Sequence, residues 1–306
     1  METLERSTNP PGETGLGLEV VFPSPRQIMR RAMLHHTGFL FGLAVIVAVT
    51  LLTILAPVLS PHDPYAQDLR QRLIPPVWQE KGTWDHPLGT DNLGRDYLSR
   101  LIYGSRVSLL IGLSVMLIAG FIGTTLGLLA GYFGGKMDMV VSFLITVRLA
   151  LPAVLVAVAV VSLIGGSMRV VILVLGLLIW DRFVVVIRAS AQQIRPLEYV
   201  AAAKSAGCST FRILAQEILP NLMNNLIVVA TLEVARAILL EAALSFLGMG
   251  VQPPTPSWGL MISEGKEFML FYPYLVTIPG VALFLLLLGF NLLGDGVRDV
   301  TAPEGR

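Results

Sequence analysis

Long apolar stretches alternate with shorter polar segments along the whole chain. A helix of about 20 apolar residues crosses the ~30 Å hydrocarbon core of a bilayer. Six stretches reach that length: residues 37–59, 107–135, 146–168, 170–191, 221–248 and 268–294. The pattern therefore predicts an all-α integral membrane protein with six transmembrane helices.

The polar segments between these stretches give the expected organisation of the chain. In order, the expected parts are a tail (1–36), the first transmembrane helix (37–59), a loop (60–106), a five-helix core (107–294) that includes polar loops at 196–220 and 249–267, and a second tail (295–306). In the first loop, Asp91 or Asn92 can cap a short amphipathic helix. The apolar side of that helix is formed by Tyr97, Leu98, Leu101 and Ile102.

Composition agrees with a membrane protein. Of 306 residues, 54% are hydrophobic and 14% are charged, and the mean hydropathy is +0.71. A soluble domain carries roughly 25% charged residues. The net charge of +1 argues against nucleic acid as a partner, and membrane lipid is expected to surround the chain. The single cysteine, Cys208, excludes an internal disulfide and is interpreted as a small filler residue.

Basic residues before the first apolar stretch indicate the orientation. Arg26, Arg30 and Arg31 precede it, and the next basic residue is Arg70. Lys and Arg are enriched on the cytoplasmic side of membrane proteins. We therefore expect cytoplasmic N- and C-termini, with the 196–220 loop inside and the 60–106 loop outside.

The polar loop has the pattern of two short helices joined by a turn. Its sequence from Glu198 to Pro220 is EYVAAAKSAGCSTFRILAQEILP. Gly207 is expected at the turn with a positive φ, and Pro220 is expected to open the next helix. Helical spacing predicts a surface of mostly small residues that another chain can approach closely, formed by Glu198, Tyr199, Ala202, Ala203 and Ala206.

The presence of charged residues within the fifth apolar stretch calls for an explanation, because a charge in a bilayer is energetically costly. Glu233 and Arg236 are three residues apart and can pair on one helix face. Glu241 lies two turns beyond Glu233, on roughly the same side. Two interpretations stay open: a polar lining of a translocation path, or an ion pair at a subunit interface.

A stripe of small residues in the second apolar stretch predicts close helix packing. Gly123, Gly127 and Gly131 follow each other at four-residue intervals. Such a stripe lets a neighbouring helix approach closely within a membrane.

The sequence contains none of three common nucleotide-binding and catalytic motifs. It lacks the G-x-x-x-x-G-K-[ST] phosphate loop, the G-x-S-x-G elbow and the H-E-x-x-H motif. His62 and His86 each lie beside a proline with no partner at ligand spacing, so we expect no metal site. The chain is expected to be no enzyme and to hold no cofactor, and any ATP hydrolysis must come from another chain.

Three strings together resemble one family. These are the polar loop, HPLGTDNLGRDYLSR from His86, and LLEAALSFLGMGVQPPTPSWGLMISEG from Leu239 to Gly265. They are similar to permeases of the dipeptide, oligopeptide and nickel ABC importers, in the branch of the second permease subunit. The polar loop resembles the coupling helix (EAA motif) of these permeases at Gly207 and Pro220, although Ala201 and Glu217 depart from the motif.

The resemblance implies the type I importer permease fold, in a bacterial inner membrane. It also implies four kinds of partner: a second homologous permease, two cytoplasmic ATPase subunits that carry ATP and Mg²⁺, and an external solute-binding protein. Family members import peptides, nickel chelates, glutathione, opines or oligosaccharides, and the motifs do not report which. The alternative from another class is an ion-coupled secondary transporter with Glu233 and Glu241 as proton carriers.

Overall fold

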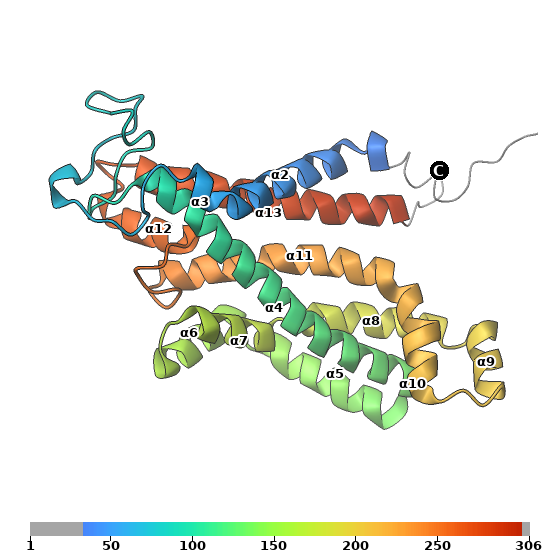
Figure 1. Ribbon diagram of the computed structural model, residues 1–306. Helices are drawn as coiled ribbons and strands as arrows, with labels where there is room; N and C mark the ends of the chain where they lie inside the picture. The colour runs from blue at the N-terminus through green and yellow to red at the C-terminus, as the bar shows by residue number, and fades with distance from the viewer. Residues whose placement is uncertain (1–32, 302–306) are drawn as a thin grey trace, which may run out of the picture.

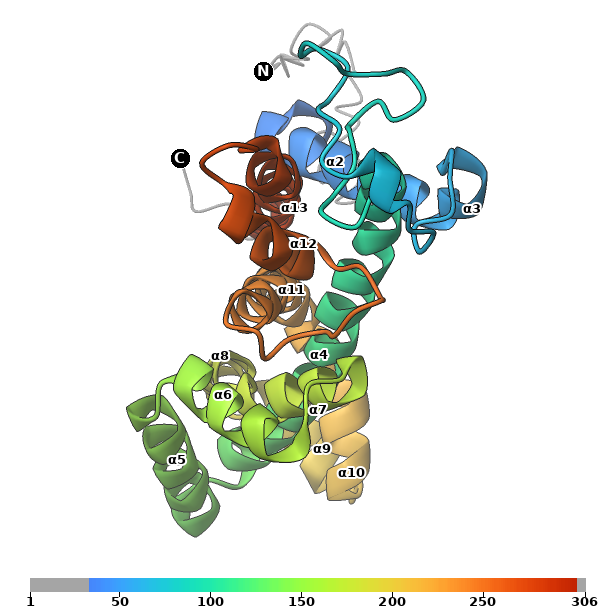
Figure 2. The ribbon, with the colours of Figure 1, turned by 90° about the vertical axis from the view of Figure 1, so that its left-hand side faces the viewer.

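The computed structural model describes residues 33–301, and this part of the chain is a bundle of helices (Figures 1 and 2). The first predicted helix is present as α2 (Thr37–Ile54) and a short continuation, α3 (Ala56–Leu59). Pro57 in the first turn of α3 explains the break at Leu55, since proline cannot continue the hydrogen-bond ladder of α2.

The longest helix joins the first loop to the second predicted span. α4 (Tyr97–Phe133) has 37 residues, so it is about 55 Å long at 1.5 Å per residue. The expected separate amphipathic helix is therefore the beginning of α4. The expected cap at Asp91 or Asn92 is wrong, because Asp96 caps α4 by accepting a hydrogen bond from the Ser99 amide at 2.8 Å.

The third predicted span is broken. Instead of one helix over 146–168, the chain forms α5 (Gly135–Ala150) and α6 (Ala153–Ile164), which are bent by 81°. Leu151 has extended angles (φ −102°, ψ 119°) because a residue before proline is driven out of the helical region, and Pro152 follows it.

The remaining spans follow the prediction more closely. The fourth consists of α7 (Met168–Leu178) and α8 (Asp181–Ile194), which together form one apolar unit of 27 residues. The fifth is α11 (Leu219–Phe246), and α13 (Tyr274–Thr301) is the sixth, after the short α12 (Trp258–Gly265).

Four helices of the described part are long and apolar enough to cross a membrane, and the bent pair α5–α6 makes a fifth. α11 is as long as α13, with 28 residues each, but it carries charges and is not among them. It packs inside the bundle against α4, α8 and α13, where polar side chains contact protein rather than lipid.

The glycine stripe of α4 faces α8. A Cβ at Gly123 would lie 2.7 Å from the carbonyl oxygen of Trp180, and a Cβ at Gly131 would lie 2.7 Å from the Ala191 Cβ. Gly127 faces Ile187 in the same way, at 3.0 Å. Only glycine permits this approach of the two helix backbones.

The bundle has two distinct ends in Figure 1. α9 (Glu198–Ser205) and α10 (Thr210–Arg212) lie at one end, together with the start of α2 and the end of α13; we call it the α9 end. Residues 60–96 and α12 lie at the opposite end, which we call the loop end.

Candidate functional site

The α9 end is built around a left-handed glycine. α9 ends at Ser205, and Gly207 has a φ of +77°, as expected for the turn. α10 follows and continues through a π-helical turn, η2 (Ile213–Ile218), into α11, with Pro220 in the first turn of α11. The turn therefore fixes the angle between α9 and the helix that leads back into the bundle.

One side of α9 packs inward and the other is exposed. Val200 is buried against Ile213 and Ile218, and Ala203 and Cys208 pack against the same cluster. Ala203, predicted as part of the exposed surface, is only partly exposed, since residue 203 follows Val200 by three positions and shares its face. Cys208 fills space there, consistent with its interpretation from sequence.

The exposed side is what we call the α9 outer face: Glu198, Tyr199, Ala202 and Ala206. Tyr199 is 38% exposed, and Phe211 on α10 is 81% exposed. A cavity of about 470 Å³ opens beside α9, lined by residues that include Tyr132, Phe133 and Lys204. The α9 end thus presents small and aromatic side chains next to a hollow.

Inside the bundle, Glu233 and Arg236 are paired as their spacing predicts. Arg236 Nη1 is 3.3 Å from Glu233 Oε2 and 3.4 Å from Asp181 Oδ1. Arg182 Nη1 is 3.4 Å from Glu233 Oε1, and Arg148 Nη2 is 3.9 Å from Asp181 Oδ1. These five residues form the charge cluster, which joins α5, α8 and α11.

The sequence identified only two members of this cluster. Arg148, Asp181 and Arg182 lie on other helices, so no local spacing connects them to Glu233. Their signal in the sequence was the presence of charge within apolar stretches.

The charge cluster borders a cavity of about 390 Å³ between α8 and α11. Glu233 is fully buried, but the Arg182 side chain is 57% exposed. A charged side chain at membrane depth must contact water or protein. This face of the bundle is therefore adapted to an aqueous path or to another protein.

Glu241 belongs to a different site. Its Oε1 accepts hydrogen bonds from Ser245 Oγ at 2.7 Å and from Ser257 Oγ at 3.0 Å. Ser257 also caps α12, so the buried carboxylate connects α11 to α12. Although its spacing places Glu241 on roughly the same side of the helix as Glu233, its hydrogen-bond partners lie at the loop end and not in the charge cluster.

A second charged group, missed from the sequence, organises the loop end. Arg95 Nε is 2.6 Å from Asp91 Oδ2, Arg100 Nη1 also contacts Asp91, and Arg100 Nη2 is 2.7 Å from Glu264 Oε2. Both arginines are buried. We call Asp91, Arg95, Arg100 and Glu264 the loop network. It joins the string that begins at His86 to the string that ends at Gly265.

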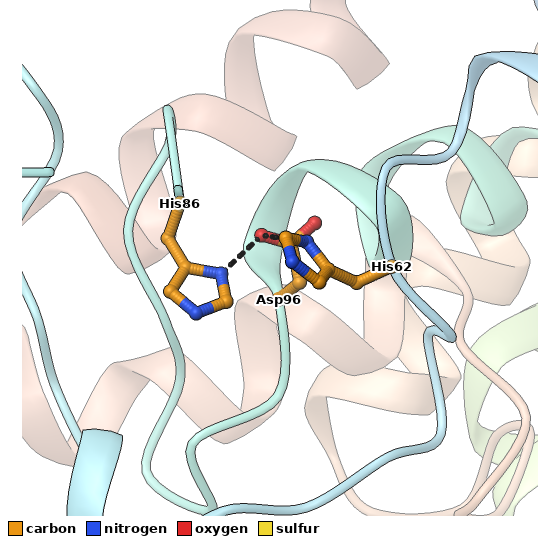
Figure 3. A group of neighbouring side chains, drawn as sticks. All are labelled: His62, His86 and Asp96. Atoms are coloured by element: carbon orange, nitrogen blue, oxygen red, sulfur yellow. Dashed lines mark hydrogen bonds and ion pairs between the residues drawn. The ribbon is translucent and has the colours of Figure 1, made fainter. Parts of the chain in front are cut away.

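The two histidines of the loop are not isolated. The ring centroids of His62 and His86 are 4.7 Å apart, and Asp96 lies next to both rings (Figure 3). The expectation that they have no partner at ligand spacing is wrong, because folding of the loop brings together residues that are distant in sequence.

A bundle of membrane-length helices, with an exposed helical turn at one end and a charge cluster inside, is typical of a multi-pass membrane protein. The chain belongs to the family of binding-protein-dependent transport system inner membrane components, whose model matches residues 123–304. The model of the N-terminal transmembrane domain of oligopeptide transport permease C matches residues 24–76. The chain is thus a permease of the ABC importer class, and the family consists of transport permeases rather than enzymes.

Similar proteins extend over nearly the whole chain. A dipeptide transport system permease protein of Haemophilus influenzae is 42% identical over 270 residues, 88% of this chain and 92% of the relative. A di/tripeptide transport system permease protein of Pseudomonas aeruginosa is 40% identical over 285 residues, 93% of this chain and 94% of the relative.

Among solved structures, the MetNI methionine ABC transporter in an inward-facing conformation has a similar chain, with a TM-score of 0.55 and 17% identity. The match covers 66% of this chain and 97% of that chain. It shows the type I importer permease fold for the core of this chain.

Proposed function

We propose that this chain is one of two permease subunits of an importer for dipeptides and other short peptides. The observation that carries the substrate class is the similarity, over nearly the whole chain, to dipeptide and di/tripeptide permeases. A binding protein delivers the peptide, and a second homologous permease completes the path. Separate ATPase subunits bind ATP and Mg²⁺.

Uptake measurements test the substrate class. Cells lacking this chain are compared with complemented cells for uptake of labelled dialanine, tetra-alanine and Ni²⁺. We expect the deletion to abolish dialanine uptake and complementation to restore it. Unchanged uptake of both peptides together with lost Ni²⁺ uptake would contradict a peptide permease.

In this proposal the α9 outer face docks on an ATPase subunit. Its small side chains allow close approach, and the glycine turn and π-helical turn connect it to α11, which carries Glu233 and Arg236. Movement of the ATPase subunits is transmitted along this route to the charge cluster. Ala202→Cys in a Cys208→Ser background should cross-link to an ATPase subunit, whereas Trp84→Cys at the loop end should not.

The α9 end lies in the cytoplasm in this proposal, and so do both termini. The basis is the Arg cluster before the first span and the position of α9 at the same end as the start of α2 and the end of α13. An impermeant thiol reagent applied to intact cells should label Trp84→Cys and spare Ser205→Cys, both without Cys208. Labelling of position 205 from outside would overturn this orientation.

The charge cluster lines the translocation path, in preference to a closed subunit interface. The supporting observations are the cavity beside it and the exposed Arg182. Glu233 already lies near two arginines and Glu241 accepts only serine hydroxyls among the described residues, so neither resembles a freely accessible proton carrier. ATP-driven import therefore explains these residues better than ion-coupled transport.

A further inference from the structure

We propose that His62, His86 and Asp96 form a binding site for one divalent transition-metal ion of the zinc type at the loop end. The three side chains come from three different segments: the end of the first span, the loop before α4, and the N-cap of α4. Each offers a ligand atom within 4.8 Å of the others (Figure 3). Two imidazoles and one carboxylate are a donor set that zinc uses, with the fourth position left to water.

Two of the three distances between the donor atoms fit one ion after a small adjustment, and the third, between the two imidazoles, is within 4.8 Å. Asp96 Oδ1 is 2.8 Å from His86 Nδ1 and 3.7 Å from His62 Nδ1. Ligand bonds of about 2.0–2.2 Å in a tetrahedral arrangement place donor atoms about 3.3 Å apart. Each of these two distances must therefore change by only about half an ångström.

Both nitrogens of His86 have a polar partner: Nε2 is 2.6 Å from Gln71 Oε1, and Nδ1 is 2.8 Å from Asp96 Oδ1. In the tautomer with the proton on Nε2, the ring donates to Gln71 and the lone pair of Nδ1 points toward the Asp96 carboxylate. A cation between Nδ1 and Asp96 Oδ1 would then take the place of the Nδ1–Asp96 hydrogen bond. A ligating histidine usually has such a partner on its other nitrogen, because that contact fixes the tautomer and the ring orientation.

His62 supplies the second nitrogen. Its Nδ1 is buried and has no hydrogen-bond partner among the described residues. The backbone amide of His62 donates to Ser99 Oγ at 3.1 Å, which holds the residue over the first turn of α4. The ring is thus placed beside Asp96, and its Nε2 lies 3.6 Å from Oδ1 of the exposed Asp85.

The surroundings attract cations. The three residues border a cavity of about 200 Å³ whose lining carries four aspartates and no lysine or arginine. This lining is made by His62, Asp63, Ala66, Gln67, Asp68, Gln71, Asp85, His86, Gly94 and Asp96. A divalent ion there would connect the end of the first span to α4 and fasten the 60–96 segment to the bundle.

Zinc binding to the purified full chain tests the proposal. The chain is purified in detergent through a tag without histidine, and Zn²⁺ binding is measured by titration calorimetry, with Mg²⁺ as the control ion. We expect one Zn²⁺ per chain, no Mg²⁺ binding at the same concentrations, and a rise in Tm with Zn²⁺. His62→Gln should weaken Zn²⁺ binding at least tenfold, while His35→Gln, at the other end of α2, should leave it unchanged.

Two further variants separate metal binding from folding. Asp96→Asn keeps an oxygen for the cap of α4 but removes the charged ligand, so it should fold and lose Zn²⁺ affinity. Gln71→Leu keeps all three ligands and should weaken binding about 10–100-fold as a positioning residue. Equal Zn²⁺ affinity of the wild-type chain, His62→Gln and Asp96→Asn, or no saturable binding by the wild-type chain, would overturn the site.

Discussion

The two ends of this permease use charged and aromatic side chains in different ways. At the loop end, the two arginines of the loop network are buried and paired within the chain, and Tyr97 donates to the Leu275 carbonyl at 2.5 Å, while Trp78 and Trp84 are exposed on the surface. At the α9 end, Tyr199 and Phe211 are exposed beside a cavity. The charged groups of the loop network are thus paired within the chain, whereas the α9 end offers exposed side chains that another chain can cover.

The charge cluster is paired within the chain, as the loop network is, but less closely. Its ion pairs range from 3.3 to 3.9 Å, and the cluster opens on a cavity, whereas the closest pairs of the loop network are shorter and enclosed. Charged residues whose only role is to stabilise the fold are expected to form short ion pairs. The looser arrangement is consistent with residues that change partners while a solute passes.

The largest loss of stability should follow from breaking the loop network. Arg100→Leu leaves Asp91 and Glu264 with one cation, Arg95, in a buried setting. Removing one partner of a buried pair costs about 3–5 kcal/mol. We expect little monodisperse protein from Arg100→Leu in size-exclusion chromatography after solubilisation. The control is Arg106→Leu, which removes an arginine that lies over the Tyr103 ring; a yield of Arg100→Leu as high as that of Arg106→Leu would mean that the loop network is dispensable.

The charge cluster should tolerate loss of a pair better than loss of one partner. Arg236→Leu leaves buried Glu233 with Arg182 alone, at a cost of about 3 kcal/mol, while replacing both partners with apolar residues is nearly neutral. We expect the Glu233→Leu/Arg236→Leu double variant to reach a higher Tm than Arg236→Leu. The double variant should nevertheless lose peptide uptake.

Two outcomes of this experiment would change the account. Equal Tm values of the single and double variants would show that the pair contributes nothing to folding. Normal uptake by the double variant would remove the charge cluster from the translocation path and leave it as an interface.

A smaller loss of stability is expected at the contact between α4 and α8, which runs between the two ends. Gly123→Ala introduces a Cβ that overlaps backbone atoms of α8, and overpacking costs about 1–3 kcal/mol. Gly280→Ala in α13 is the matched control, because no atom lies within 4 Å of its added Cβ. Thermal unfolding in detergent should give a lower Tm for Gly123→Ala and an unchanged or higher Tm for Gly280→Ala. Equal Tm values would mean that α8 can shift without cost.

The sequence predicted features that depend on near neighbours. The positive φ of Gly207, the Glu233–Arg236 pair and the glycine stripe of α4 all follow from short spacings. The break before Pro152 also had a local signal, which the apolar run around it concealed. No local signal predicted the partners that come from other segments. These residues meet only after the chain folds: Asp181 beside Arg236, Glu264 beside Arg100 and His62 beside His86.

The most direct measurement concerns the α9 end, where stability should change least and function most. Gly207→Val costs about 1–2 kcal/mol of local backbone strain, and no neighbouring atom opposes the new side chain. Gly248→Val is the matched control, since Gly248 has a φ of +78°, is equally free of neighbours and lies outside the α9 end.

Both variants should be expressed in the membrane at near-normal levels, because the helices that cross it are packed by other residues. The measurement is co-purification with the ATPase subunits, followed by substrate-stimulated ATP hydrolysis with the binding protein present. The account predicts that Gly207→Val loses both association and stimulation and that Gly248→Val keeps association, with Ala202→Glu behaving like Gly207→Val through steric exclusion. Normal association and stimulation in both Gly207→Val and Ala202→Glu would contradict the role of α9 as the coupling element.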